Sequence, residues 1–295
     1  MAAEPVVTRT PSTLVDFFEL TKPRVMILLL VTMVGAMVWA EGGLPPLWLL
    51  ASALLGMGLT TGGASAINHA LDRDLDRRME RTRDRPVAAE RLEPRAAIFF
   101  GIVLSVLGVA VLFALTTPLA ALMGLIGNVF YVVVYTMWLK RRTPQNIVIG
   151  GAAGAFPPMI GWAAVTGDVS VASVVLFLLI FFWTPPHFWA LALFRSGDYA
   201  KAGVPMLPVV AGAAATKRQM LIYTLILLPL SLAPFSLGTA GGWYAAGALC
   251  LSALFILSAL RVLGSNDDRP AKQMFGFSIL YLFALFALLI VDRAG

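Results

Sequence analysis

Long apolar stretches separated by short polar breaks dominate the pattern of this sequence. Each stretch is close to twenty residues long, which is enough for a helix to cross a hydrocarbon core of about 30 Å. The breaks are rich in Gly, Pro, Thr and charged residues, which commonly end helices. The pattern predicts an all-α, polytopic membrane protein with nine transmembrane helices. Their expected ranges are 23–40, 47–68, 96–115, 118–139, 146–165, 169–194, 219–237, 242–263 and 274–291.

Composition supports this prediction and excludes a soluble domain. The 295 residues are 59% hydrophobic and only 13% charged, and their mean hydropathy is +0.84. A soluble domain has about 25% charged residues, so this chain has too few to cover a surface that faces water. Ten-residue blocks of alternating polarity, which indicate a transmembrane β-barrel, do not recur along the sequence. A lipid bilayer is the expected environment.

Positive charge divides the predicted connections into two sets. Of the 22 Lys and Arg residues, 21 lie near the N-terminus or in alternate connections, and Arg293 is the exception. Because Lys and Arg concentrate in cytoplasmic loops, we expect a cytoplasmic N-terminus and an extracytoplasmic C-terminus in a bacterial-type inner or plasma membrane. The net charge of +6 is then an orientation signal, and no nucleic-acid partner is expected.

The N-terminal segment differs from the rest of the chain. Residues 1–21 carry no apolar run, so we expect a mobile cytoplasmic tail there. Residues 22–295 are expected to form a single transmembrane domain.

Oxygen-bearing side chains at a regular spacing mark the end of the second apolar stretch. Asn68, Asp72 and Asp76 are four residues apart, so on a helix they share one face at the membrane surface. Mg²⁺ prefers oxygen ligands and usually binds one or two carboxylates together with substrate phosphates. Arginines that suit phosphate surround this face at positions 73, 77, 78, 81, 83 and 85. The pattern predicts magnesium-dependent chemistry on a diphosphate substrate, with the three residues as the catalytic set.

Two neighbours of this face have different expected roles. Asp74 points to another side of the helix and is expected to pair with nearby arginines, whereas His69 is expected to support the site from behind or to be solvated. The alternative interpretation of the whole segment is a solvated helix end with alternating charge, which is common at membrane surfaces.

A second polar connection, residues 195–218, lies on the same predicted side of the membrane as residues 68–95. The two connections follow the sixth and second spans, and both carry basic residues and prolines. We therefore expect two related helical halves whose polar loops face each other over a central cavity open to the cytoplasmic side.

His187 is an ionisable residue within a predicted span, directly after Pro185 and Pro186. A histidine inside a membrane bundle is a functional candidate. The alternative is a hydrogen-bonded structural histidine. We favour a contact with a ligand over that alternative.

Four motifs together resemble a known family. The first is Asn-x3-Asp-x3-Asp from Asn68, followed from Met79 by Met-x-Arg-Thr-x2-Arg-Pro, and it resembles the signature of the UbiA superfamily of membrane prenyltransferases. Residues 139–162, the Trp-Thr-Pro-Pro-His-Phe-Trp run at 183–189 and the Asp-Tyr-Ala-Lys-Ala-Gly-Val-Pro run at 198–205 are similar to its protoheme IX farnesyltransferase branch.

The resemblance implies a nine-helix bundle and a reaction. The farnesyl group of farnesyl diphosphate would be joined to a vinyl group of protoheme IX, with addition of water, to give heme O and diphosphate. Mg²⁺ would be the cofactor, held by Asn68, Asp72, Asp76 and Asp198. The implied contacts to diphosphate are Arg81, Arg85, Lys140, Arg141 and Lys201, and His187 would contact the heme.

One departure and two alternatives accompany this resemblance. The wider superfamily has a second Asp-x3-Asp motif, but here Ala202 stands four residues after Asp198. Prenyl transfer to an aromatic acceptor such as 4-hydroxybenzoate would use the same first motif. A membrane transporter is a more distant alternative, and the position of the acids at one membrane face disfavours it.

Overall fold

The computed structural model describes residues 13–294, and the regular elements among them are helices, without a strand. The spans are α2 (Pro23–Glu41), α3 (Leu47–Leu71), α5 (Pro94–Leu115), α6 (Pro118–Val129) continued by η1 (Phe130–Trp138) and η2 (Leu139–Arg141), α7 (Asn146–Thr166), α8 (Val171–Phe194), α11 (Gly212–Ser236), α12 (Gly242–Leu263) and α13 (Asp268–Ala294). The shorter helices are α1 (Thr13–Leu20), α4 (Arg73–Arg78), α9 (Ser196–Ala202) and α10 (Leu207–Val210).

The described residues contain nine helices long and apolar enough to cross a membrane, so the prediction of an all-α bundle with nine spans is confirmed. Two predicted starts were wrong. Helix α11 begins at Gly212 rather than residue 219, and α13 begins at Asp268 rather than residue 274. The extra turns carry charged residues that can reach water, while the helix continues to satisfy its own backbone hydrogen bonds.

Large apolar side chains cover the outside of the bundle. On α5, Phe99 is 71% exposed and Phe113 is 63% exposed, and neither would be favourable in contact with water. Exposed apolar surface of this extent marks a membrane-facing protein, and the helices satisfy the backbone hydrogen bonds that lipid cannot.

Helices α3 and α5 approach each other through glycines. A Cβ atom on Gly63 would lie 2.5 Å from the carbonyl oxygen of Gly101, and one on Gly101 would lie 2.7 Å from that of Gly63. Small residues allow helix backbones to pack closely in membranes, where van der Waals contact replaces the hydrophobic effect between helices. This close packing fixes the helix that carries Asn68 near its C-terminal end.

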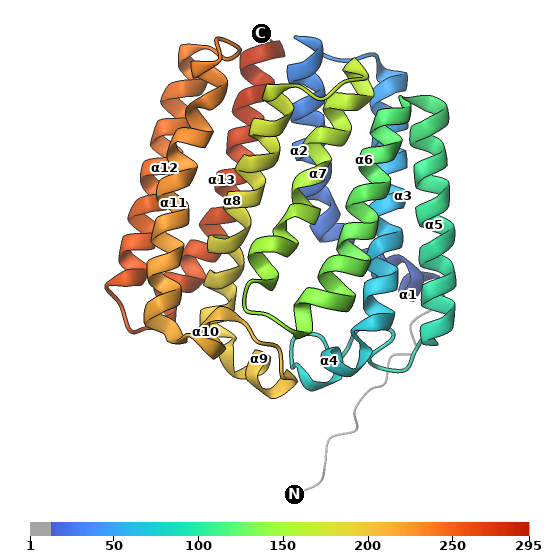
Figure 1. The fold of residues 1–295 in the computed structure, drawn as a ribbon, viewed down its shortest axis with the longest axis vertical. Helices are drawn as coiled ribbons and strands as arrows, with labels where there is room; N and C mark the ends of the chain where they lie inside the picture. The colour runs from blue at the N-terminus through green and yellow to red at the C-terminus, as the bar shows by residue number, and fades with distance from the viewer. Residues whose placement is uncertain (1–12, 295) are drawn as a thin grey trace, which may run out of the picture.

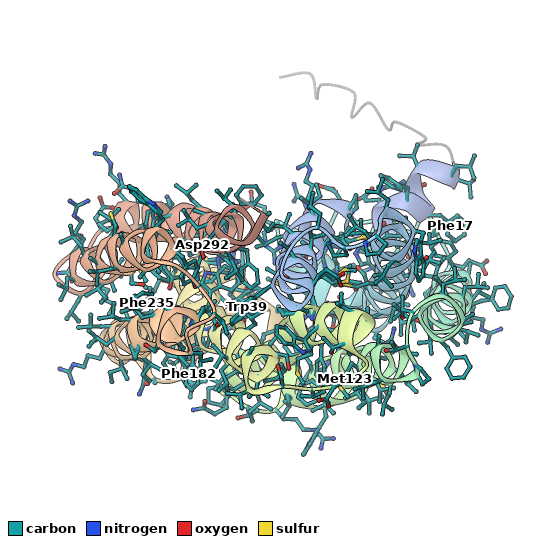
Figure 2. All side chains as sticks on the ribbon, turned by 90° about the horizontal axis from the view of Figure 1, so that it is seen from above. Phe17, Trp39, Met123, Phe182, Phe235 and Asp292 are labelled. Carbon is teal, nitrogen blue, oxygen red and sulfur yellow. The ribbon has the colours of Figure 1, made fainter. Side chains whose placement is uncertain are left out.

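Seen end-on, the helices form two packed groups (Figure 2). Helices α11, α12 and α13 lie at one side, and α3, α5 and α6 lie at the other. Trp39 of α2 lies between these groups and packs edge-on against Trp162 of α7, with ring centroids 5.7 Å apart. Residues of α2, α7 and α8 belong to the same apolar cluster as residues of α11, α12 and α13.

The two polar connections meet at one end of the bundle. Figure 1 shows α4, α9 and α10 at the same end, opposite the C-terminal end of α13. Leu75 and Met79 pack there in one apolar cluster with Tyr199, Val204 and Met206 of the second connection. The prediction that these connections face each other is confirmed.

Part of the predicted N-terminal tail is folded onto the domain. Residues 1–12 lie outside the described residues, but Thr13–Leu20 form α1, and Asp16 and Leu20 are buried. Arg91 donates a hydrogen bond of 2.9 Å to Asp16. The docked domain thus begins earlier than residue 22, because an ion pair and an apolar contact hold α1 in place.

Candidate active site

Asn68, Asp72 and Asp76 lie together where α3 ends and α4 begins. The backbone N–H of Asp72 donates to the Asn68 carbonyl at 2.9 Å, and that of Asp76 donates to the Asp72 carbonyl at 2.8 Å. These bonds keep helical spacing across the junction, so the side chains stay on one face. All three residues are buried. The prediction of a shared face is confirmed, and the alternative of a solvated helix end does not fit such burial.

Three cations close this face, each from a different segment. Arg85 binds both carboxylate oxygens of Asp76, at 3.0 and 2.9 Å. Lys140 pairs with Oδ2 of Asp72, and Lys22 donates to Oδ1 of Asn68 at 2.6 Å. The two carboxylates therefore face three basic side chains, one more than they can pair with, and an anionic ligand would stabilise the charged form of the extra amine.

Lys22 was not among the predicted site residues, although it lies at the centre of this network. It precedes Pro23 at the start of α2 and adopts a left-handed backbone conformation, with φ 51°. Such a φ is uncommon for a residue other than glycine and often accompanies a functional role. Burial, reinforced by Arg85 and Lys140, holds the pKa of Lys22 well below its ordinary value. The sequence signal that could have identified Lys22 was its position directly before Pro23, which starts a helix at the membrane face.

A π-helical segment supports the amide of Asn68. In η1, Thr136 accepts a hydrogen bond of 3.1 Å from Nδ2 of Asn68, and Tyr131 lies within 3.4 Å of the Lys22 amine. Gly150 of α7 leaves room for this wider helix, since a Cβ there would overlap the Tyr135 ring. π-Helical turns are frequent at functional sites, and hydropathy carries no signal for them.

The oxygen atoms at the junction suit a hard divalent cation. Oδ1 of Asp72 is enclosed and has no hydrogen-bond partner, while Oδ2 accepts from Nδ2 of Asn68 at 2.6 Å. Among residues 13–294, no group of three His, Cys, Asp or Glu residues could hold a metal by itself. Mg²⁺ takes one or two protein carboxylates and completes its coordination with water and phosphate, which is the number of carboxylates that Asp72 and Asp76 offer.

Two of the predicted phosphate contacts lie at the surface. Arg141 binds both oxygens of Asp74, at 2.9 and 2.7 Å, and donates to the Leu71 carbonyl at 2.8 Å. These hydrogen bonds lower the pKa of Asp74. Asp74 thus pairs with an arginine, as predicted, but this arginine is 67 residues away and is not one of its neighbours in the sequence. Arg81 is exposed on the connection after α4. Diphosphate contacts by Arg81 and Arg141 stay predictions.

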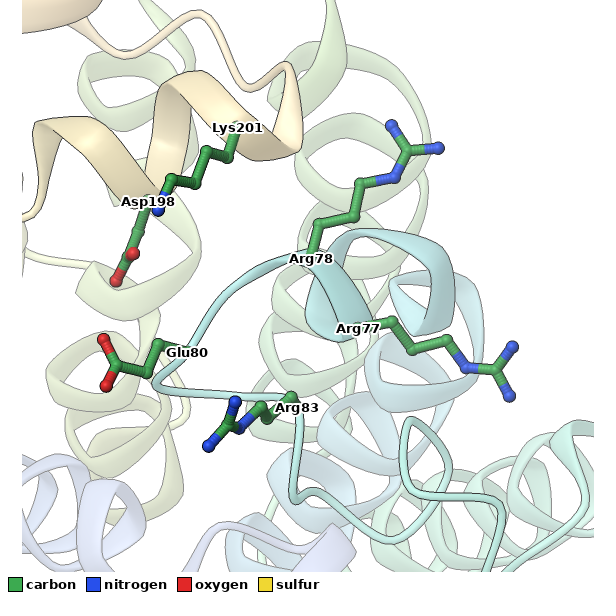
Figure 3. A pocket seen from close by; sticks show the side chains of 6 residues that line it. All are labelled: Arg77, Arg78, Glu80, Arg83, Asp198 and Lys201. Atoms are coloured by element: carbon green, nitrogen blue, oxygen red, sulfur yellow. The ribbon is translucent and has the colours of Figure 1, made fainter. Parts of the chain in front are cut away.

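Asp198 and Lys201 lie in a neighbouring pocket of about 260 Å³. Figure 3 shows them on α9, across from Glu80 and Arg83. Asp198 pairs with Arg195 at 3.7 Å, and the described residues do not join it to Asp72 and Asp76 in one metal-binding group. The roles of Asp198 in metal binding and Lys201 in phosphate binding therefore stay predictions.

His187 is buried in α8 between aromatic rings. Its ring stacks on Trp183 with centroids 4.4 Å apart and on Phe275 with centroids 4.7 Å apart. Nδ1 lies 2.6 Å from the Ser278 hydroxyl. The surroundings are flat and apolar, which suits contact with a porphyrin, whereas the charged junction suits phosphate.

His69 is the other histidine of the sequence, and the structure corrects one part of its expected role. It is only 2% exposed, so it is not solvated. Both ring nitrogens are enclosed without a hydrogen-bond partner. Lys22, Arg85 and Lys140 lie close enough to act on the ring electrostatically, so His69 borders the same charged site from behind.

Comparison with known proteins identifies the family. The model of the UbiA prenyltransferase family matches residues 28–288. A protein named protoheme IX farnesyltransferase from Parvibaculum lavamentivorans is 53% identical over 94% of this chain and 88% of its own length. Another of that name from Gloeobacter violaceus is 51% identical over 98% of this chain and 95% of its own length.

Solved structures share the fold. A digeranylgeranylglyceryl phosphate synthase structure has a TM-score of 0.79 at 18% identity, covering 95% of this chain and 98% of the other. A UbiA homolog from Archaeoglobus fulgidus bound to GPP and Mg²⁺ has a TM-score of 0.64 at 19% identity, covering 94% and 99%. The fold, the buried Asn-Asp-Asp face and the family match agree, and the chain belongs to the UbiA prenyltransferase family.

Proposed function

We propose that this protein transfers the farnesyl group of farnesyl diphosphate to a vinyl group of protoheme IX, with addition of water, giving heme O and diphosphate. Relatives about half identical over nearly the whole chain carry the name protoheme IX farnesyltransferase. The reaction takes place at the cytoplasmic face of the membrane, where the basic connections are expected to lie.

One observation most directly supports binding of the diphosphate group at this junction. Three basic side chains from separate segments converge here: Arg85 and Lys140 pair with the two buried carboxylates, and Lys22 donates to the oxygen of Asn68 beside them. A buried excess of charge is costly unless an ion of opposite sign balances it. A diphosphate would supply that balance, and its release would return the cations to the carboxylates.

Asn68, Asp72 and Asp76 would hold Mg²⁺, as the free Oδ1 of Asp72 and the oxygen-only donor set favour. Bound there, the ion would act as a Lewis acid that stabilises charge on the departing diphosphate. Lys22, Lys140 and Arg85 bind phosphate oxygens and stabilise the same charge, and such electrostatic stabilisation usually accelerates a reaction of this kind more than any other effect. The apolar bundle excludes water from the allylic carbon while its bond to oxygen breaks.

The acceptor would lie against α8 and α13. Trp183, His187 and Phe275 form an apolar aromatic lining that a porphyrin could contact. The electron-rich vinyl carbon attacks the farnesyl carbon as the diphosphate leaves. Water then adds to the cation formed beside the porphyrin and loses a proton to solvent, which leaves the hydroxyl group of heme O. A central cavity joining the two regions stays a prediction of the family fold.

Substitution of the carboxylates tests the proposal. We expect Asp72→Ala and Asp76→Ala to lower heme O formation by about 10² to 10³-fold, since each removes a group that stabilises the leaving diphosphate. Asp74→Ala is the matched control, because Asp74 is exposed and pairs with Arg141. Purified variants would be supplied with protoheme, farnesyl diphosphate and Mg²⁺, and the product read by mass. Wild-type turnover by Asp72→Ala would remove the site.

Two further experiments test the identity of the acceptor and the requirement for the metal. Replacing protoheme by 4-hydroxybenzoate should give no farnesylated product, and formation of one would instead support the aromatic-acceptor alternative. Chelation by EDTA should abolish turnover, and Mg²⁺ should restore it. Turnover that continues in EDTA would contradict the magnesium requirement.

A further inference from the structure

The imidazole of His187 is held so that only one edge is free. Trp183 and Phe275 cover its two faces, and Phe188 packs perpendicular to it at 5.0 Å between centroids. Nδ1 is tied to the Ser278 hydroxyl at 2.6 Å. The edge that carries Nε2 is therefore the part of the ring that remains available to a ligand.

The hydrogen bonds of Ser278 determine which nitrogen carries the proton. Its hydroxyl lies 2.6 Å from the Phe275 carbonyl, which can only accept. A hydroxyl has a single proton, and placing it toward His187 would leave two oxygen lone pairs facing each other at that distance. The Ser278 proton therefore goes to the Phe275 carbonyl, and the hydroxyl oxygen accepts from Nδ1–H of His187.

With the proton on Nδ1, Nε2 of the neutral ring carries a lone pair. Among the described residues Nε2 makes no hydrogen bond, yet it is not one of the enclosed side-chain atoms without a partner, and His187 keeps 8% of its surface exposed. A basic nitrogen that a ligand can reach, but that has no hydrogen-bond partner in an apolar span, is stabilised by binding a Lewis acid. Metal-bound histidines almost always donate their other N–H to an oxygen in this way.

We propose that Ser278 fixes His187 as the Nδ1–H tautomer, so that Nε2 donates its lone pair to the iron of the heme substrate. The inference rests on the proposed function, which supplies heme as the acceptor. His187 lies seven residues before the end of α8, about 10 Å deep at the rise of an α-helix. The iron would then lie inside the bundle, with the heme edge toward the polar end. Ser278 is the positioning residue, and it acts through His187.

Titration of the full-length protein with hemin, without farnesyl diphosphate, tests the ligand. The optical and resonance Raman spectra of wild type should show an iron–imidazole bond. The sequence has two histidines, so His187→Ala should lose that signal and His69→Ala should keep it. Added imidazole should restore the signal in His187→Ala. An unchanged spectrum in His187→Ala would overturn the proposal.

Variants of Ser278 test the positioning role. Ser278→Ala should weaken hemin binding about tenfold, the lower end of the effect of such supporting residues, and should move the ferrous iron–imidazole stretch to lower frequency. Ser278→Thr keeps a hydroxyl and should restore both. Ser252→Ala is the matched control, because Ser252 is a buried hydroxyl bound to Ser231 and Tyr281, not to His187. An unshifted stretch in Ser278→Ala would overturn the role of Ser278.

The two levels of the proposal fail in different ways. Hemin that binds without an iron–imidazole signal in wild type would overturn the ligand inference and leave the proposed function standing. Wild type that binds no hemin would remove the heme acceptor, and with it both proposals.

Discussion

The junction of α3 and α4 concentrates charge, whereas the surroundings of His187 consist of aromatic rings and one hydroxyl. At the junction, Asp72 and Asp76 are each bound by a cation from another segment. At His187, the contacts are ring stacks and a single hydrogen bond to Ser278. Both regions are buried in a bundle whose spans are otherwise apolar.

The difference follows from what each region would have to bind and release. A diphosphate carries several charges, so its site needs cations that have another partner when the ligand has left. A porphyrin is flat and largely apolar, so contacts with aromatic side chains and one basic nitrogen are sufficient to place it. The two regions match the two substrates of the proposed reaction, and variants that affect one substrate alone would test that division.

Among the variants that separate the two regions, Lys22→Met should have the largest effect, and only on the charged region. Lys22 Nζ lies 2.6 Å from Oδ1 of Asn68, where it would meet phosphate. We expect the specificity constant for farnesyl diphosphate to fall about 100-fold, with hemin binding unchanged. Steady-state kinetics and a hemin titration measure the two. Lys217→Met is the control, because Lys217 bonds to the Ser265 carbonyl at the far helices. Equal losses for both substrates would contradict the division.

The importance of Lys22 could not be read from hydropathy. Its partner Asn68 is 46 residues away, so the contact depends on how α2 packs against α3. The same limit applies to Arg85 and Lys140. Both were predicted phosphate contacts, but the sequence could not show that each pairs with one particular aspartate. Contacts between segments depend on tertiary packing, which local pattern does not encode.

The predictions that were confirmed rest on helical periodicity and on the apolar composition of the spans. The nine spans follow from apolar length, and the shared face of Asn68, Asp72 and Asp76 follows from helical spacing, which continues across the junction. The early starts of α11 and α13 were not predicted, because hydropathy does not distinguish a polar end turn of a helix from a loop. The π-helix of η1 was not predicted, because hydropathy does not distinguish π-helical from α-helical turns.

Variants of Arg85 and Asp76 distinguish the contribution of charge to stability from its contribution to activity. Arg85→Met leaves the Asp76 carboxylate buried without its partner, so we expect unfolding free energy to fall by about 2 kcal/mol. The loss is smaller than for a fully buried pair because the Arg85 side chain keeps 22% exposure. The double variant Asp76→Asn with Arg85→Met should recover most of that stability but no activity. Thermal unfolding in detergent and the product assay measure the two. A double variant as unstable as Arg85→Met would show that charge pairing is not the cause.

Trp183→Phe should affect the aromatic region alone, and by less. The indole N–H donates to the Ser278 carbonyl at 2.8 Å, so Phe keeps a stacked ring but loses that bond. We expect hemin affinity to fall about threefold, the effect of one neutral hydrogen bond, with kinetics in farnesyl diphosphate unchanged. Trp39→Phe is the control, since Trp39 packs against Trp162 instead. A loss in farnesyl diphosphate kinetics would show that the regions are coupled.

The pair of Asp74 and Arg141 should have the smallest effect, although its geometry is as good as that of Asp76 and Arg85. The Asp74 side chain is 53% exposed, so solvent screens the pair, and Asp74→Ala should change unfolding free energy by less than about 0.5 kcal/mol. Arg141 lowers the pKa of Asp74, so the contribution is present above the unfolded pKa and is lost as pH falls through the folded value. Thermal unfolding of both proteins from neutral to acid pH should converge at the acid end. A difference in stability between the two proteins that widens toward acid pH would mean that Asp74 stabilises the junction by something other than charge. The contrast between the exposed and the buried ion pair would then not result from burial.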